Sequence, residues 1–165
     1  MTILWTIAIL IGTVVLDQLS KMWVVRAIAP VGSVWVWENV LRFTYVENSG
    51  AAFGMLAQHR WIFLVFSTAA IAGIAVYLFW KRPRGLWAVS LSLIAGGGVG
   101  NMIDRLAHGY VVDFIDVTCI PGWKFVFNVA DTFVCVGCGL LLLAMILDEV
   151  RERRRTAAPR QKNDG

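Results

Sequence analysis

The chain has 165 residues, of which 58% are hydrophobic and 16% charged, and its formal net charge at pH 7 is +4. Soluble proteins average roughly 45–50% apolar and about 25% charged residues. The composition therefore excludes an ordinary water-soluble globular protein. The apolar residues are gathered in long runs, which indicates a membrane protein with a single domain.

Four apolar runs are long enough to span a bilayer, which takes about 20 mostly apolar residues per helix. The spans are predicted at residues 3–25, 61–80, 86–103 and 129–147. The first run lacks the basic start and the small-residue cleavage site of a signal peptide, so it is expected to be retained as a helix. The sequence therefore predicts an all-α polytopic membrane protein with four transmembrane helices in one domain over residues 1–150.

Basic residues mark two places outside the apolar runs. Lys81, Arg82 and Arg84 separate the second and third runs, and residues 151–165 form a basic tail. Such clusters also occur in nucleic-acid-binding proteins, but beside transmembrane runs they indicate the cytoplasmic side of the membrane. Both termini are therefore expected in the cytoplasm, and the chain after about Asp148 is expected to be disordered.

The connection between the first and second spans, residues 30–58, then faces outward and is patterned as β structure. Its stretch SVWVWENVLRFTYVEN is rich in Val, Trp, Phe and Tyr, with Glu38 and Asn39 at a plausible turn, which predicts a small extracytoplasmic hairpin. A hairpin without membrane contact is the alternative to one seated in the lipid headgroup zone. The aromatic residues that suit that zone are Trp35, Trp37, Phe43 and Tyr45.

No metal or cofactor is expected. Cys135 and Cys138 form a C-x-x-C pattern, but they lie inside an apolar run where small packing residues are the simpler interpretation. His59 and His108 lack the spacing of metal ligands. The glycine-rich run at residues 96–100 suits close helix packing and has no Walker lysine, so a nucleotide site is disfavoured.

Polar residues gather near the same membrane face as the hairpin. An ionisable side chain at membrane depth is costly unless it is paired, so each is a candidate functional residue. For Asn128 and Asp131 the alternative is that they cap the fourth helix. The residues concerned are Asn101, Asp104, Arg105, Asp113, Asp116, Asn128 and Asp131.

Asp113 and Asp131 are the strongest pair among these. Pro121 and Gly122 lie between them and predict a turn that folds the connection back and brings the two carboxylates together. Two carboxylates in one site share a proton, which permits general acid–base hydrolysis of a peptide bond without a metal. A serine nucleophile at Ser49 with His108 as base is a weaker alternative, because Ser49 does not lie on a strand–helix elbow.

Five short motifs now stand in order along the four spans. They are DQLSK at 17–21, ENSGAAFG at 47–54, GNMIDR at 100–105, VVDF at 111–114 and FNVAD at 127–131. In this order the chain resembles the bacterial lipoprotein signal peptidases, also called signal peptidase II. The resemblance implies an aspartic endopeptidase of the bacterial inner membrane that acts on diacylglyceryl-modified prolipoproteins and cuts just before the lipidated cysteine.

The resemblance also implies residue roles and partners. Asp113 and Asp131 match the catalytic pair, and the hairpin matches a clamp over the lipidated cysteine. The implied partners are the prolipoprotein and membrane lipid, with no nucleic acid, and the chain is expected to be a monomer. The implied substrate-binding positions are Asn48, Gly50, Asn101, Arg105 and Asn128.

Four further charged residues are expected to orient the structure and not to react. Asp17 and Lys21 lie one helical turn apart and predict an (i, i+4) ion pair in the first helix. Asp104 and Asp116 are expected to orient the outward loop.

Two other functions are compatible with charged groups in a membrane. A proton-coupled transporter also uses intramembrane acids, although four spans without an internal repeat are few for one. A purely structural membrane scaffold predicts that loss of Asp113 has no functional effect.

Overall fold

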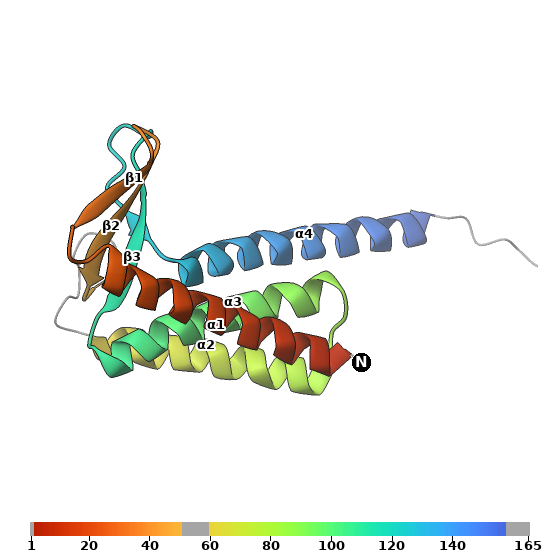
Figure 1. Cartoon of the computed structure of the whole chain (residues 1–165). Helices are drawn as coiled ribbons and strands as arrows, with labels where there is room; N and C mark the ends of the chain where they lie inside the picture. Colours follow the sequence, from red (N-terminus) through yellow and green to blue (C-terminus); the bar gives the residue numbers. More distant parts are fainter. Residues whose placement is uncertain (1, 51–59, 158–165) are drawn as a thin grey trace, which may run out of the picture.

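The computed structural model describes residues 2–50 and 60–157 of the chain (Figure 1). Residues 51–54 of the ENSGAAFG motif, His59 and the end of the tail lie outside the described residues. The elements are α1 Thr2–Ala27, β1 Ser33–Trp37, β2 Leu41–Asn48, α2 Arg60–Lys81, α3 Leu86–Ala107, β3 Val111–Val117, β4 Val126–Phe127 and α4 Val129–Ala157.

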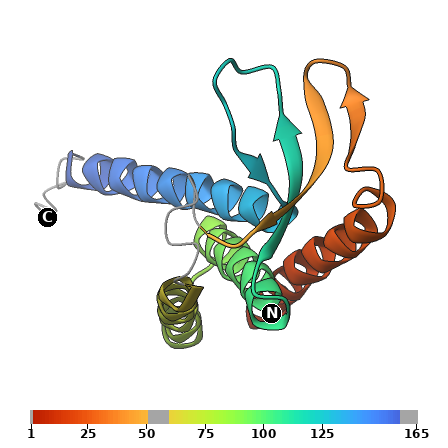
Figure 2. The same ribbon diagram turned by 90° about the vertical axis from the view of Figure 1, so that its left-hand side faces the viewer.

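The four predicted spans correspond to α1, α2, α3 and α4, and within the described residues each of these helices is long and apolar enough to cross a membrane. Half of the α3 span is buried in the protein, against 11–17% of the other three spans. Helix α3 is therefore the centre of the bundle (Figure 2), and exposed apolar side chains of its neighbours are left for lipid. The predicted polytopic helical fold is confirmed.

Glycines on α3 let its neighbours approach closely. A Cβ at Gly97 would lie 2.5 Å from the carbonyl oxygen of Ala130, at the start of α4. A Cβ at Gly100 would collide with the carboxylate of Asp17 on α1. Backbones that approach this closely need residues without a side chain at the contact. The glycine run is therefore a packing surface, as predicted, and it brings the polar residues of α1 and α4 together.

A four-stranded antiparallel sheet of order β1-β2-β3-β4 stands at one end of the helices (Figure 2). The predicted hairpin forms its first half, and Asn39 takes a left-handed turn conformation at φ 59°. The second half comes from the connection between α3 and α4, where β3 was not predicted as a strand. The predicted turn at Pro121 and Gly122 is present, with Gly122 at φ 79°, and it folds β4 back onto β3.

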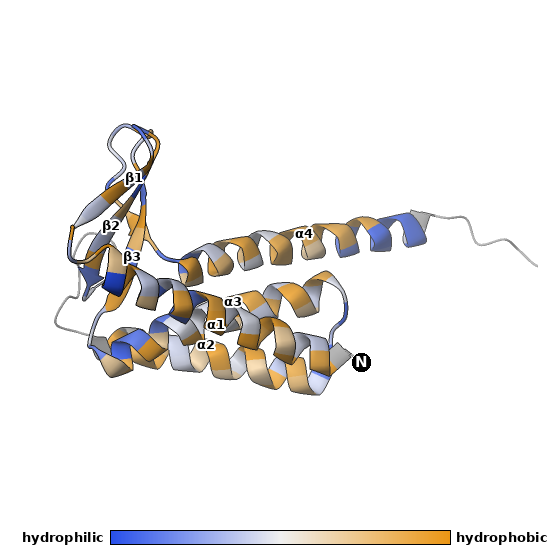
Figure 3. Cartoon of the chain, in the orientation of Figure 1, coloured by the Kyte–Doolittle hydropathy of each residue, from blue (hydrophilic) through white to orange (hydrophobic). Residues whose placement is uncertain are grey.

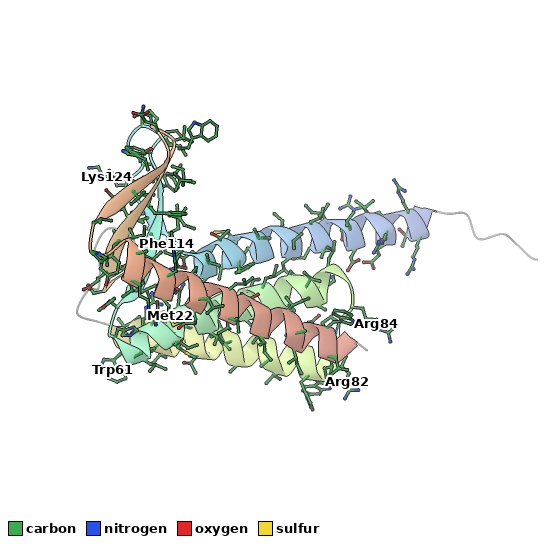
Figure 4. The ribbon with its side chains drawn as sticks, in the orientation of Figure 1. Met22, Trp61, Arg82, Arg84, Phe114 and Lys124 are labelled. Carbon is green, nitrogen blue, oxygen red and sulfur yellow. The ribbon has the colours of Figure 1, made fainter. Side chains whose placement is uncertain are left out.

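The sheet is attached to the helices by a small apolar cluster, in which Val24 of α1 and Ile28, directly after α1, meet Val112 and Phe114 of β3. Figure 4 shows Phe114 at the base of the sheet. Phe43 and Tyr45 pack against this cluster.

The four aromatic residues that were predicted to face lipid headgroups differ in their exposure. Phe43 and Tyr45 are half-buried against this cluster, so only part of each ring is left for the membrane surface. Trp35 and Trp37 are 46% and 68% exposed and remain available to the membrane surface.

The opposite end of the bundle is basic. Arg82 and Arg84 lie at the end remote from the sheet (Figure 4). Helix α4 continues past its predicted end at residue 147 to Ala157, and its last turns are hydrophilic (Figure 3). The predicted disorder after Asp148 is therefore wrong as far as Ala157. The pair between Arg153 and Glu149, with 2.6 Å between Nε and Oε1, supports the helix there.

Cys135 and Cys138 are exposed on α4, so the prediction that they are packing residues is wrong. The face of α4 that touches α3 carries Ala130, Val134 and Gly137 instead. The two cysteines lie one position beyond the last two of these residues, which turns them away from α3.

Candidate active site

Buried polar side chains gather where the sheet meets the helices. They come from α1, α3, β3 and the junction between β4 and α4, so they are distant in the sequence. Their burial at one point of an apolar protein requires that they satisfy one another. The most buried are Asp17, Lys21, Asp104, Asp113 and Asn128, which are at most 3% exposed.

Asp113 lies on β3 and accepts hydrogen bonds on both carboxylate oxygens. Asn128 Nδ2 donates to its Oδ1 at 2.6 Å, and Asn48 Nδ2 donates to its Oδ2 at 2.8 Å. The β2–β3 register brings Asn48 to this point, because it pairs Asn48 with Val111 at the start of β3. Gly50 donates its N–H to Asn48 Oδ1 at 3.1 Å, which turns the amide nitrogen of Asn48 towards Asp113.

Asp131 lies in the first turn of α4 and forms a reciprocal cap with Asn128. Asp131 N donates to Asn128 Oδ1 at 2.8 Å, and Asn128 N donates to Asp131 Oδ2 at 3.3 Å. This is the arrangement of a capping box, so the capping alternative is correct. It does not occupy the whole carboxylate, because Asp131 Oδ1 accepts a 2.7 Å bond from Asn101 Nδ2.

Asn128 therefore joins the two aspartates that the sequence singled out. The pKa of Asp113 is raised to about 6, chiefly by burial and also by the charge on Asp131, although hydrogen bonds from Asn48 and Asn128 and the charge on Lys21 oppose the rise. A carboxyl group with this pKa is partly protonated near neutral pH. Two coupled carboxylates in this state supply both a proton donor and a proton acceptor.

A buried ionic cluster lies next to the pair. Lys21 Nζ bonds Asp17 Oδ2 at 2.8 Å and Asp104 Oδ2 at 3.0 Å, and it donates to Asn101 Oδ1 at 2.9 Å. The predicted (i, i+4) pair of Asp17 and Lys21 is present, and it is one part of a larger arrangement. Gln18, which was not predicted to have a role, donates to Asp104 Oδ1 at 3.0 Å. It could have been recognised in the sequence as a polar residue inside a predicted transmembrane run.

Arg105 and Asp116 lie at different distances from this centre. Arg105 follows Asn101 by one turn on α3, donates to the Asn101 carbonyl oxygen at 3.4 Å, and interacts electrostatically with Asp131 and Asp113. Asp116 is engaged elsewhere on the sheet. It accepts bonds of 2.9 and 2.6 Å from Arg42, which lies opposite it on β2. Asp116 thus holds two strands together.

A serine nucleophile and a metal site have less support among the described residues. Ser49 and His108 are both exposed, and His108 stacks on Tyr110 with ring centroids 5.7 Å apart. No group of three or more metal-ligating side chains occurs among residues 2–50 and 60–157.

Comparisons with known proteins show the family to which the chain belongs. The family described as signal peptidase (SPase) II matches residues 9–147. The lipoprotein signal peptidase of Syntrophomonas wolfei is 42% identical over 141 residues, which cover 86% of this chain and 92% of that protein. The lipoprotein signal peptidase of Clostridioides difficile is 40% identical over 147 residues, which cover 89% of this chain and 98% of that protein.

The fold is also shared with a solved structure. A bacterial membrane enzyme determined by the in meso method at 2.3 Å resolution superposes with a TM-score of 0.79 at 27% identity, and the match covers 97% of this chain and 94% of that chain. The family match, the two relatives and the fold lead to one identification. This chain is a member of the signal peptidase II family.

Proposed function

We propose that Asp113 and Asp131 are the catalytic pair of an aspartic endopeptidase. Membership of the family makes the chain a protease that removes the signal peptide from prolipoproteins, and this replaces the transporter and scaffold alternatives. The aspartic mechanism is supported above all by one observation. Asn128 donates to Asp113 and is bonded in both directions to Asp131, so two acids from different elements share one buried site.

In the proposed reaction the two carboxyl groups hold one proton between them at rest. The ionised group takes a proton from a water molecule while the water oxygen attacks the carbonyl carbon of the scissile bond. The protonated group gives its proton to the carbonyl oxygen, which produces a tetrahedral gem-diol. In the second step the first group returns its proton to the leaving nitrogen, the C–N bond breaks, and the other group takes a proton from the diol. The pair is then ready for the next turnover.

The neighbouring side chains fit supporting roles in this reaction. Asn48 donates to Asp113 and Asn101 donates to Asp131, which holds the two acids in place. Asn128 sets the distance between them. Arg105 lies beside the pair with a planar fork of donors suited to substrate carbonyl oxygens. Gly50 is buried and acts through its bond to Asn48, which adds a positioning role to the close substrate approach that the sequence suggested.

We also propose the placement of the enzyme in the bacterial cytoplasmic membrane. The site lies at the sheet end of the helices, and Arg82 and Arg84 lie at the other end (Figure 4). The positive-inside rule then puts both termini in the cytoplasm and the site near the outer face. There the sheet, with Trp35 and Trp37 exposed, is suited to clamp a substrate whose cysteine carries a diacylglyceryl group. We further propose that the enzyme acts as a monomer.

The test is cleavage of a diacylglyceryl-modified prolipoprotein by the purified protein in detergent. An unlipidated precursor, Asp113→Asn and Asp131→Asn are run alongside. The proposal expects cleavage of the lipidated form only, just before the modified cysteine, and no turnover by either folded variant. Turnover by either variant would exclude the dyad, and equal cleavage of the unlipidated precursor would exclude recognition of the lipid.

A further inference from the structure

Each proposed catalytic aspartate follows a residue whose backbone N–H is held by another buried carboxylate. Ala130 N donates to Asp17 Oδ1 at 2.9 Å, directly before Asp131. Val112 N donates to Asp104 Oδ2 at 3.1 Å, directly before Asp113. The peptide units that carry the two acids are therefore anchored to α1 and to α3.

Lys21 ties these two anchors together. Its ammonium group lies 2.8 Å from Asp17 Oδ2 and 3.0 Å from Asp104 Oδ2. An ammonium group has three donors, and the third reaches Asn101 Oδ1 at 2.9 Å. A single cation thus fixes the distance between the carboxylate that anchors Ala130 and the carboxylate that anchors Val112.

The third bond of Lys21 also sets the direction of two amides. Because Lys21 donates to Asn101 Oδ1, the amide nitrogen of Asn101 must point the other way, and it donates to Asp131 Oδ1 at 2.7 Å. Asn101 Oδ1 accepts a second bond, from Asn128 Nδ2 at 3.1 Å, and the same nitrogen donates to Asp113 Oδ1 at 2.6 Å. A reversed Asn101 amide would point an oxygen at a carboxylate.

The cluster is satisfied throughout, as a buried network must be. Besides Lys21, each anchoring carboxylate accepts from a backbone N–H and from Gln18, whose Nε2 lies 3.2 Å from Asp17 Oδ2 and 3.0 Å from Asp104 Oδ1. A simple stabilising pair within α1 would need only Asp17 and Lys21. The additional hydrogen bonds connect Lys21 to Asp113 through Asp104 and Val112, and to Asp131 through Asp17 and Ala130 and through Asn101.

We propose that Lys21, with Asp17 and Asp104, is a positioning network that holds Asp113 and Asp131 in register for catalysis. The proposal rests on the function proposed above, because it concerns the same pair of acids. Lys21 touches neither acid directly and acts through the two anchored peptides and through Asn101. Its removal is expected to loosen the catalytic geometry more than the binding of substrate.

The main test is Lys21→Met, assayed with the lipidated prolipoprotein in detergent. A small displacement of reacting groups costs on the order of 100-fold in rate, so kcat is expected to fall about that much while KM stays within about threefold. Thr13→Val is the matched control. Thr13 is also a buried polar residue of α1, but within residues 2–50 and 60–157 its hydroxyl bonds to the Ile9 carbonyl oxygen of its own helix and not to the network. Its kcat is expected to equal that of the wild type.

A second variant separates positioning from folding. Lys21→Met alone leaves two buried carboxylates without their cation, which is destabilising. The double variant Lys21→Met/Asp104→Asn keeps the net charge of the cluster, and the amide oxygen of the substituted side chain can still accept from Val112 N. It is expected to unfold at a temperature close to the wild type, yet to retain the low kcat. Gln18→Leu, at the edge of the network, is expected to lose roughly tenfold in kcat.

The pH–rate profile gives a readout that a purely structural role would not move. In the described part of the chain, the charged groups that face the pair are Lys21 and Asp17 of α1 and Asp104 and Arg105 of α3. The Lys21 cation favours ionised carboxylates. Its loss in Lys21→Met is therefore expected to move both limbs of the profile to higher pH, whereas Thr13→Val leaves them in place.

Each outcome bears on one proposal. If the wild type cleaves and the Asp→Asn variants do not, a folded Lys21→Met or double variant with wild-type kcat and pH profile would overturn the positioning role alone. If neither Lys21 variant folds, full kcat in Gln18→Leu would overturn it. If Asp113→Asn or Asp131→Asn still cleaves, the dyad itself is wrong and the positioning role is excluded with it.

Discussion

Asn128 and Asp131 bond to each other twice across the first turn of α4, with donor–acceptor distances of 2.8 and 3.3 Å. The same Asn128 side chain reaches Asp113 with its amide nitrogen at 2.6 Å. The start of the helix and the alignment of the two acids therefore depend on one residue. FNVAD is therefore a helix cap, and the proposed catalytic pair is built on that cap.

The two contributions of Asn128 can be separated by substitution. Asn128→Ser keeps a side-chain oxygen that caps a helix well but removes the donor to Asp113. We expect Asn128→Ser to unfold near the wild-type temperature and to lose most of its activity. Asn128→Ala is expected to lose activity and, in addition, about 1 kcal/mol of stability. Thermal unfolding and cleavage assays in the same detergent check this, and an active Asn128→Ser would contradict it.

The pKa of Asp113 predicts how stability depends on pH. Burial raises this pKa from the usual value of 3.8 to about 6 in the folded protein. The folded state then binds the proton more tightly than the unfolded state, so the contribution is fully present below about pH 4 and is lost as the pH rises through about 6. In Asp113→Asn this loss is absent. We expect the unfolding temperature of Asp113→Asn, relative to the wild type, to increase between pH 4 and pH 7.

A pH-independent difference between the two proteins over that range would contradict the raised pKa. Asp116→Asn is the matched control, because Asp116 lies on the same strand and is bonded to Arg42 at the sheet surface. Its unfolding temperature relative to the wild type should not follow the pattern of Asp113→Asn.

Gly100 tests the close approach between α1 and α3. A Cβ at this position would meet the carboxylate of Asp17, which holds the backbone before Asp131. We expect Gly100→Ala to cost about 1–3 kcal/mol, the usual range for overpacking, and to reduce kcat by displacing Asp17. The control is Gly139→Ala on α4, where nothing lies within 4 Å of the new Cβ. Alanine there is expected to be neutral or slightly stabilising, and similar behaviour of the two variants would refute the close contact.

Arg105 is expected to act on the substrate. Arg105→Ala removes the fork of donors next to the pair, and we expect kcat/KM to fall by about 10- to 100-fold. Arg105→Lys keeps the charge but not the planar geometry, so it should recover only part of the loss. Steady-state kinetics with the lipidated substrate measure both variants. Full activity in Arg105→Ala would show that the guanidinium does not contact substrate or transition state.

The sequence by itself determined the membrane class, the four spans, the hairpin with its turn at Asn39 and the choice of Asp113 and Asp131 as a pair. These features depend on local composition: a long run of apolar residues indicates a transmembrane helix, and a charged residue beside it is a candidate functional residue. The motifs shared with the family contain the same two aspartates. None of these inferences required knowledge of which segments meet in space.

Only the tertiary structure shows which residues and strands contact one another. The second half of the sheet escaped prediction because β3 carries two aspartates and β4 is only Val126–Phe127, which is too short to show a pattern. The positions of Phe43 and Tyr45 depended on the cluster beneath them. Above all, the bond from Ala130 to Asp17 joins residues 113 positions apart. Such contacts arise only when glycines allow the helices to approach, and the chemistry of the site depends on that approach.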